Sequence, residues 1–287
     1  MISPTALRRP GPDPSDDPAQ APAADGPQGS TGAAGTAPAA SIHSHVLSVV
    51  ASRICSDGDA SGTDCLAVLT EALLVSEAAF DRALAQVRAR HGADDAEIVD
   101  CYIPAVACRL GTDWTDNRRS FAEVTIGTAR LIAAVRDIGR RWHADAVADW
   151  NAPAMAMVVP EAEQHRLGAM IAATRFRRAG VSVQLMLGRP DAEVVARIRD
   201  GDFDMVSFSL AARERVEQTR RLIQILRETV APLPPIVVGG AVGACADELK
   251  LQLGADHVVS DPEEALRRCG VTVAKRRNGN SAAGPAA

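Results

Sequence analysis

The chain is poor in aromatic residues and has no long hydrophobic run. Phe, Trp and Tyr make up 3% of its 287 residues. No apolar stretch approaches the roughly 18 residues that a membrane helix needs, and the start Met1-Ile2-Ser3-Pro4 lacks the charged-then-apolar order of a signal peptide. We therefore expect a soluble, cytoplasmic protein. Hydrophobic residues still form 47% of the chain, enough for the cores of two modest domains.

Several motifs that mark common enzyme classes are also missing. There is no Gly-x-Gly-x-x-Gly loop, no Gly-x-x-x-x-Gly-Lys loop and no Gly-x-Ser-x-Gly elbow, so NAD binding, nucleotide hydrolysis and hydrolase chemistry are disfavoured. The six cysteines contain no Cys-x-x-Cys pair, so we expect buried thiols in a reducing compartment and no zinc or iron–sulfur site. A net charge of −5 provides no overall electrostatic attraction for nucleic acid, so little direct binding is expected.

Composition divides the chain into four parts. Residues 1–40 hold eight of the 17 prolines and no aromatic residue, which predicts a disordered tail; residues 273–287 are similar. Residues 41–145 have helical periodicity, with breaks expected at Asp57-Gly58, Gly92 and Gly111-Thr112-Asp113, and predict a helical-bundle cap. The apolar stripes of this cap are Leu66, Leu69, Leu73 and Leu74, and Phe121, Val124, Leu131, Val135, Ile138 and Trp142.

Short apolar strands alternate with amphipathic helices over residues 150–272. Strands are expected near 154–159, 181–187, 205–209, 236–239 and 257–259, with helices near 166–179, 191–200, 212–229, 244–253 and 262–269. Five such βα units predict an α/β fold, a flavodoxin-like doubly wound five-stranded parallel sheet. Arginines near 213–227 flank an apolar stripe and predict a solvated helix face, not a phosphate site.

The segment after the first strand carries a metal-ligand pattern. Glu163 precedes His165 by two residues, and Gly168 follows three residues later. A coordinating histidine works best when its second ring nitrogen donates to a carboxylate, and a glycine lets a bulky group approach the backbone. The alternative for a lone histidine is a surface residue near a helix start.

Two later segments agree with this pattern. The third strand ends in Ser207-Phe208-Ser209-Leu210 and the fourth in Gly239-Gly240. Together the three segments resemble the cobalamin-binding fingerprint, acidic residue-x-His-x-x-Gly followed by Ser-x-Leu and Gly-Gly. The resemblance implies cobalamin as cofactor, His165 as lower axial ligand of cobalt, and serines and glycines lining the slot for the nucleotide tail. For the glycine pair, ordinary strand-to-helix turn geometry stays an alternative.

This fingerprint has two departures. Glu163 stands where many members have Asp, which retains the carboxylate. Ala211 stands where the leucine of Ser-x-Leu would fall, which only loosens packing.

The cap carries a second resemblance, from Tyr102 to Glu123. The stretch Tyr102-Ile103-Pro104-Ala105 … Leu110-Gly111-Thr112-Asp113-Trp114 … Ser120-Phe121-Ala122-Glu123 is similar to the four-helix cap of corrinoid carriers and cobalamin photoreceptors, in which the tryptophan, here Trp114, lies over the upper corrin face. From the residues alone, Trp114 could also be a core residue at a helix start. The neighbouring Asp113 and Asp116 indicate a wet loop.

The next two residues bear on function. Val124-Thr125 occupies the place of an acidic-His pair that adenosylcobalamin photoreceptors and methyl carriers have. The run Gly-x-x-Trp-x-Asp-x-Arg-x-Ser-Phe-x-Glu-Val-Thr-Ile-Gly, from Gly111 to Gly127, looks like the AerR/PpaA group of purple photosynthetic bacteria, and the resemblance covers about residues 43–272 of the chain. That resemblance implies a light-responsive, cobalamin-binding antirepressor of photosynthesis genes without enzyme activity, acting on a repressor of the CrtJ/PpsR type. From the residues themselves, His43 or His45 is a candidate upper ligand of cobalt, and the polarity typical of a helix start explains the two histidines as well.

Two other functions remain open at this stage. A corrinoid carrier of a methyltransferase system would share both fold and cofactor with the regulator. A haem- or redox-sensing regulator could use His165 to hold iron, and the colour of the purified protein would distinguish it.

Overall fold

The computed structural model describes residues 61–148, 152–161, 163, 165–210, 216–240 and 246–273. The predicted N-terminal tail, the C-terminal tail from residue 274 on, the break at Asp57-Gly58, the two histidines His43 and His45, and Ala211 lie outside these residues. None of the helices in the described ranges is long and apolar enough to cross a membrane.

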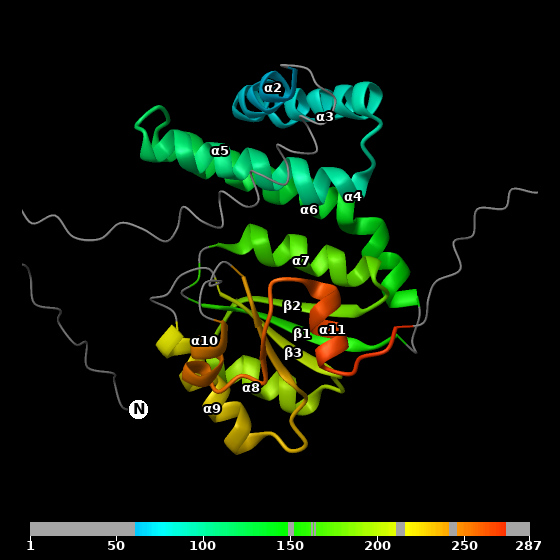
Figure 1. Cartoon of the computed structure of the whole chain (residues 1–287), viewed down its shortest axis with the longest axis vertical. Helices are drawn as coiled ribbons and strands as arrows, with labels where there is room; N and C mark the ends of the chain where they lie inside the picture. The colour runs from blue at the N-terminus through cyan, green and yellow to red at the C-terminus, as the bar shows by residue number, and fades with distance from the viewer. Residues whose placement is uncertain are drawn as a thin grey trace, which may run out of the picture. The chain divides into compact units, whose positions relative to one another are not determined.

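The N-terminal part of the described chain is helical, as predicted (Figure 1). Its elements are α2 (Ser61–Val75), α3 (Glu77–His91), α4 (Asp95–Glu97), the π-helical turn η1 (Ile98–Tyr102), α5 (Ile103–Thr115) and α6 (Phe121–Ala148). These helices, called the cap below, bury one apolar cluster. Leu69 and Leu73 of α2, Phe80 of α3, and Leu131 and Val135 of α6 are each almost completely buried in it.

The helix boundaries in the cap agree with the sequence at one break and disagree at another. Gly92 ends α3 in the left-handed conformation (φ 66°), as expected. The break predicted at Gly111-Thr112-Asp113 is wrong, because α5 continues through these residues to Thr115. Helix α5 ends there because the Asp113 carbonyl accepts hydrogen bonds from the backbone N–H groups of Arg118 and Arg119, at 2.7 and 3.1 Å.

Two further features of the cap differ from expectation. Ser76 separates α2 from α3, since its hydroxyl accepts a hydrogen bond from Ala79 N at 3.1 Å and so caps α3. Phe121 is 73% exposed and does not belong to the buried stripe that includes Leu131 and Val135. It is the first residue of α6, where the helix extends past the core.

The C-terminal part is the predicted doubly wound sheet. Its strands are β1 (Ala154–Pro160), β2 (Ser182–Arg189), β3 (Met205–Ser209), β4 (Ile236–Gly239) and β5 (His257–Val258). All neighbouring strands are parallel, in the order β2-β1-β3-β4-β5. The helices are α7 (Arg166–Arg178), α8 (Asp191–Asp200), α9 (Val216–Thr229), α10 (Ala246–Leu253) and α11 (Pro262–Arg268).

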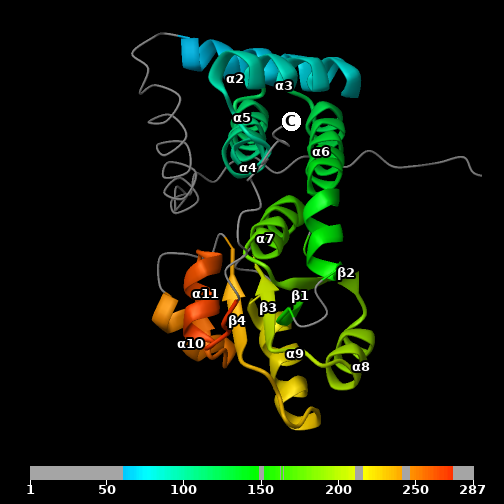
Figure 2. The same ribbon diagram turned by 90° about the vertical axis from the view of Figure 1, so that its right-hand side faces the viewer.

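The two faces of the sheet pack against different helices (Figures 1 and 2). Met155 and Met157 of β1 share one apolar cluster with Phe176 of α7 and Leu266 of α11. The opposite face packs on α8, α9 and α10 through a second cluster that includes Phe208. On α9 the arginines lie on the solvated side as predicted, since Arg220 and Arg221 pair with Glu217.

Helix α7 belongs to both parts of the fold. Ala173 and Phe176 pack on the sheet, whereas Leu167 and Met170 lie in the apolar cluster of the cap. Near its C-terminal end, Arg178 forms an ion pair with Asp100 of η1. The helix that begins directly after His165 is therefore packed on both sides.

Candidate functional site

The three motifs predicted from the sequence meet at one edge of the sheet. Strands β1, β3 and β4 are neighbours. The first motif follows β1, and the other two lie at the carboxyl ends of β3 and β4. The chain connects β1 to β2 on one side and then crosses to β3 on the other, so the strand order reverses between β1 and β3. Ligands of doubly wound sheets bind at this kind of reversal.

Glu163 and His165 form a closed local unit. The Glu163 side chain is 2% exposed, and its Oε1 accepts hydrogen bonds from the backbone N–H of His165 at 2.9 Å and from His165 Nδ1 at 2.6 Å. Because Nδ1 is engaged with a carboxylate, the proton is held there and Nε2 is the nitrogen available to a metal. The imidazole side chain is 69% exposed, so a ligand can reach it.

Gly168 lies one turn further along the same face of α7. It is exposed, and a Cβ atom added there would meet nothing within 4 Å. Packing within the protein therefore does not require glycine at this position. That this glycine lets a bulky group approach His165 stays a prediction.

Small residues line one face of the sheet where β3 and β4 end. Ser209 pairs in register with Gly239, and Ser207, 6% exposed, pairs with Val237. Because side chains alternate along a strand, these residues point to the same face as Met205, the face covered by α7 and α11. The side chains at these positions are small, and a Cβ atom added at Gly239 would lie 3.2 Å from the Val259 carbonyl oxygen, so packing within the protein also restricts that position.

The backbone at position 240 requires glycine for a structural reason. Its φ is +120°, and a Cβ atom added there would lie 2.2 Å from the carbonyl oxygen of Leu210. The turn that follows β4 therefore requires glycine whether or not a ligand is present. Turn geometry accounts for Gly240, and the tail slot is better tested at Ser209.

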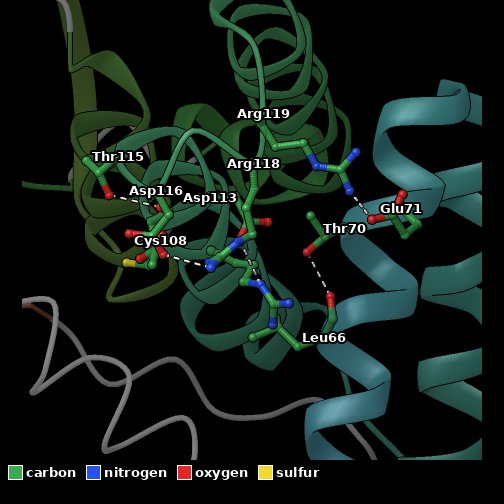
Figure 3. A network of polar contacts seen from close by, with 11 residues as sticks. Leu66, Thr70, Glu71, Cys108, Asp113, Thr115, Asp116, Arg118 and Arg119 are labelled. Carbon is green, nitrogen blue, oxygen red and sulfur yellow. Dashed lines mark hydrogen bonds and ion pairs between the residues drawn. The ribbon is translucent and has the colours of Figure 1, made fainter.

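Trp114 is not a core residue. It is 50% exposed in the last turn of α5, which contradicts the core alternative. The wet loop expected around it is only half correct. The Asp116 side chain is 47% exposed, whereas Asp113 is 4% exposed and pairs with Arg118, whose Nη2 lies 2.7 Å from Asp113 Oδ1 (Figure 3).

The polar side chains that open α6 are occupied by contacts within the helix and with the two residues that precede it. Glu123 Oε2 accepts hydrogen bonds from the backbone N–H and the hydroxyl of Ser120, both at 2.8 Å, and Arg119 Nη1 lies 3.2 Å from Glu123 Oε1. These hydrogen bonds, first those from Ser120, hold the pKa of the Glu123 carboxyl below its ordinary value. The Thr125 hydroxyl donates to the Phe121 carbonyl at 2.8 Å.

The side chains available as metal donors suit a metal ion whose other ligands come from a cofactor. Within the described residues there is no group of three His, Cys, Asp or Glu that could hold a bare ion. His165 offers a single exposed nitrogen, next to a sheet face lined by small residues. A corrinoid fits this arrangement, because its ring supplies the equatorial ligands and its tail needs a slot.

Comparisons with known proteins identify the class. Residues 154–269 match the family model of the B12 binding domain. The monomethylamine corrinoid protein of Methanosarcina barkeri has the same fold, with a TM-score of 0.55 at 14% identity over 69% of this chain and 93% of that one. A cobalamin-binding protein from Desulfitobacterium hafniense DCB-2 aligns with a TM-score of only 0.38, at 18% identity over 71% of this chain and 97% of that one. The chain is a cobalamin-binding protein with a Rossmann-like domain.

A curated relative narrows this class to one family. The chain is 31% identical, over 165 residues, to the "uncharacterized 20.5 kDa protein in bchF-crtJ intergenic region" of Rhodobacter capsulatus, covering 58% of this chain and 86% of the relative. The chain belongs to the same family, which agrees with the AerR/PpaA resemblance seen between Gly111 and Gly127.

Two polar clusters of the structure were not anticipated from the sequence. Asp113 binds Arg118 and Arg109, a set of residues so close in the chain that helical spacing could have suggested it. Asp100 binds Arg178, which is 78 residues away, and no local sequence signal indicates that pair.

The first prediction concerns the metal ligand. We expect His165→Ala to abolish or sharply weaken cobalamin retention, because it removes the axial nitrogen. Glu163→Ala should cost less, about 10–100-fold in affinity, since it removes a group that only orients the ligand. Glu163→Gln should cost least, because its amide oxygen can still accept from Nδ1. Titration followed by absorbance measures all three, with exposed His91→Ala as control; wild-type binding by a folded His165→Ala protein would refute the ligand assignment.

The second prediction separates stability from binding at Gly168. Gly168→Ala lies in a helix with open space around it, so it should stabilise the cofactor-free protein by about 0.5–1 kcal/mol. The same methyl group, and more strongly Gly168→Leu, should weaken cobalamin binding by occupying the approach to His165. Thermal unfolding and binding are measured on the same samples. Unchanged affinity in both variants would show that the corrin does not pass this position.

The third prediction tests the tail slot at Ser209. Ser209→Ala should cost one hydrogen bond, about 0.5–1.5 kcal/mol, while Ser209→Leu should exclude the tail by bulk. Calorimetry compares cobalamin with tail-less cobinamide. If Ser209→Leu weakens both corrinoids equally, the slot lies elsewhere.

Proposed function

We propose that this protein is a light-responsive, cobalamin-dependent transcriptional regulator, an antirepressor of photosynthesis genes that acts through a repressor protein of the CrtJ/PpsR type. Its membership in one family with a protein encoded between bchF and crtJ supports this proposal. The net charge of −5 favours a protein partner over direct contact with DNA.

The observation that carries the proposal is the state of the residues that open α6. A methyl carrier benefits from a proton donor or acceptor near the upper face of the corrin. In this chain Glu123 is held ionised by Ser120 and Arg119, Val124 is apolar, and the Thr125 hydroxyl is bound to its own helix. The hydrogen bonds of these residues stabilise the start of α6. A fixed helix start suits a sensor protein that presents a surface to a partner protein.

The chain's own residues would convert a change at the cofactor into a change of surface. When bound, an alkylated cobalamin supplies a cobalt–carbon bond that light can break. His165 would hold the cofactor from below, and Trp114 would cover it from the cap, as the family resemblance implies. Because α7 starts beside His165 and buries Leu167 in the cap's cluster, a shift at the site reaches the cap through direct packing.

The runner-up, a corrinoid carrier of a methyltransferase system, shares this architecture. The resemblance to the M. barkeri corrinoid protein concerns the fold alone at 14% identity, so it favours neither function. Only a functional assay separates them.

The fourth prediction is a light-dependent interaction. Cobalamin-loaded, illuminated protein should bind a CrtJ/PpsR-type repressor and change its hold on promoter DNA, while binding little DNA itself. Pull-down and DNA-shift assays in dark and light measure this, with His165→Ala as the control that cannot load. Methyl transfer to a thiol or folate acceptor, without any light-dependent partner binding, would favour the carrier instead.

A further inference from the structure

Trp114 sits in a segment whose backbone is fixed although its side chain is half-exposed. The backbone N–H of Asn117 donates to the Trp114 carbonyl at 2.9 Å, and Asn117 adopts the left-handed conformation with φ 56°. On the other side of Trp114, the Asp113 carbonyl accepts from the N–H groups of both Arg118 and Arg119. The main chain on either side of the tryptophan therefore has little freedom.

An arginine clamp reinforces this backbone (Figure 3). Arg118 places Nε at 3.0 Å and Nη2 at 2.7 Å from Asp113 Oδ1, and its Nη1 at 2.8 Å from Asp116 Oδ2. Arg118 thus joins the residues on both sides of Trp114. A second arginine, Arg109, reaches the same Asp113 oxygen from the preceding turn of α5, with Nε at 3.3 Å.

A neighbouring set of contacts ties this loop to the rest of the cap. Arg119 forms ion pairs with Glu71 of α2 and with Glu123 of α6. Figure 3 shows Arg118 and Arg119 reaching toward different partners from adjacent positions. The loop cannot move as a unit without breaking contacts to both helices.

Burying the carboxylate of this clamp has an unfavourable free energy, which its contacts must offset. Asp113 is 4% exposed, and a buried carboxylate is unfavourable unless it is paired and hydrogen-bonded. A half-exposed tryptophan on a fixed helix end also leaves unburied a ring that gains from burial. Both features make sense if the ring is held ready for a flat apolar surface, since ordering it in advance lowers the entropic cost of binding.

The geometry points to Asp113 and Arg118 as a positioning pair that pre-orders Trp114 for stacking on the corrin, without touching the cofactor themselves. This inference rests on the placement of Trp114 over cobalamin in the proposed function. It adds one requirement to that placement. The contribution of Trp114 to cobalamin affinity depends on the ion pair between Asp113 and Arg118.

A double-mutant cycle on the full chain tests the pair. Hydroxocobalamin affinity is measured for Trp114→Ala, Arg118→Ala and the double variant. We expect Arg118→Ala to weaken binding about fivefold and the double variant to bind no worse than Trp114→Ala alone, because residues that act through one contact are not additive. Arg118→Lys should restore little, since a lysine cannot bridge both carboxylates with a planar fork.

Arg199→Ala is the matched control. Arg199 also pairs with an aspartate, and its side chain is 55% exposed against 56% for Arg118. The Arg199→Ala variant should bind cobalamin like the wild type. If Arg118→Ala lowers the thermal midpoint sharply, Asp116→Ala takes its place in the cycle, since it removes only the outer contact of the clamp.

A second readout needs no cofactor. In a Trp142→Phe/Trp150→Phe background, the fluorescence anisotropy of Trp114 should fall on Arg118→Ala and stay unchanged on Arg199→Ala. Unaltered affinity in Trp114→Ala would refute the placement of Trp114, and the clamp's role with it. A loss in Trp114→Ala with no loss in Arg118→Ala, or with losses that add in the double variant, would overturn the positioning role alone.

Discussion

The structure depends on the double packing of α7. Most surface helices bury one stripe, but α7 buries Ala173 and Phe176 against the sheet and Leu167 and Met170 in the core of the cap. This helix begins at the residue after His165. The position of the proposed metal ligand and the packing of the cap are therefore set by one rigid element, and neither can change without straining the other.

The two exposed side chains proposed to contact the cofactor are restrained in a similar way. A buried carboxylate, Glu163, fixes the ring of the exposed His165. Another buried carboxylate, Asp113, pairs with Arg118 and fixes the end of α5, which carries the exposed Trp114. In both cases the side chain that would contact the ligand is exposed but is restrained, directly or through Arg118, by a buried carboxylate. A site built in this way has its geometry before the cofactor arrives.

Local patterns predicted most of this fold, and long-range contacts explain what they missed. The strands were found because parallel strands are buried on both faces and read as short apolar runs, and the Glu163–His165 contact spans only two residues. The break expected at Gly111 failed because an isolated glycine does not end a helix; the captured carbonyl of Asp113 does. The pairing of Asp100 with Arg178 joins distant segments, so no window of sequence contains it.

The turn at Gly240 bears on how relatives of this protein should be sorted. Its backbone conformation and its contact with the Leu210 carbonyl demand glycine for folding alone. A lineage that had lost the cofactor would keep Gly240 for folding, whereas under the proposed ligation it would no longer be selected for His165 and Gly168. Gly240 therefore marks ancestry, and His165 and Gly168 are the positions that would report retention of the corrinoid if they serve it as proposed.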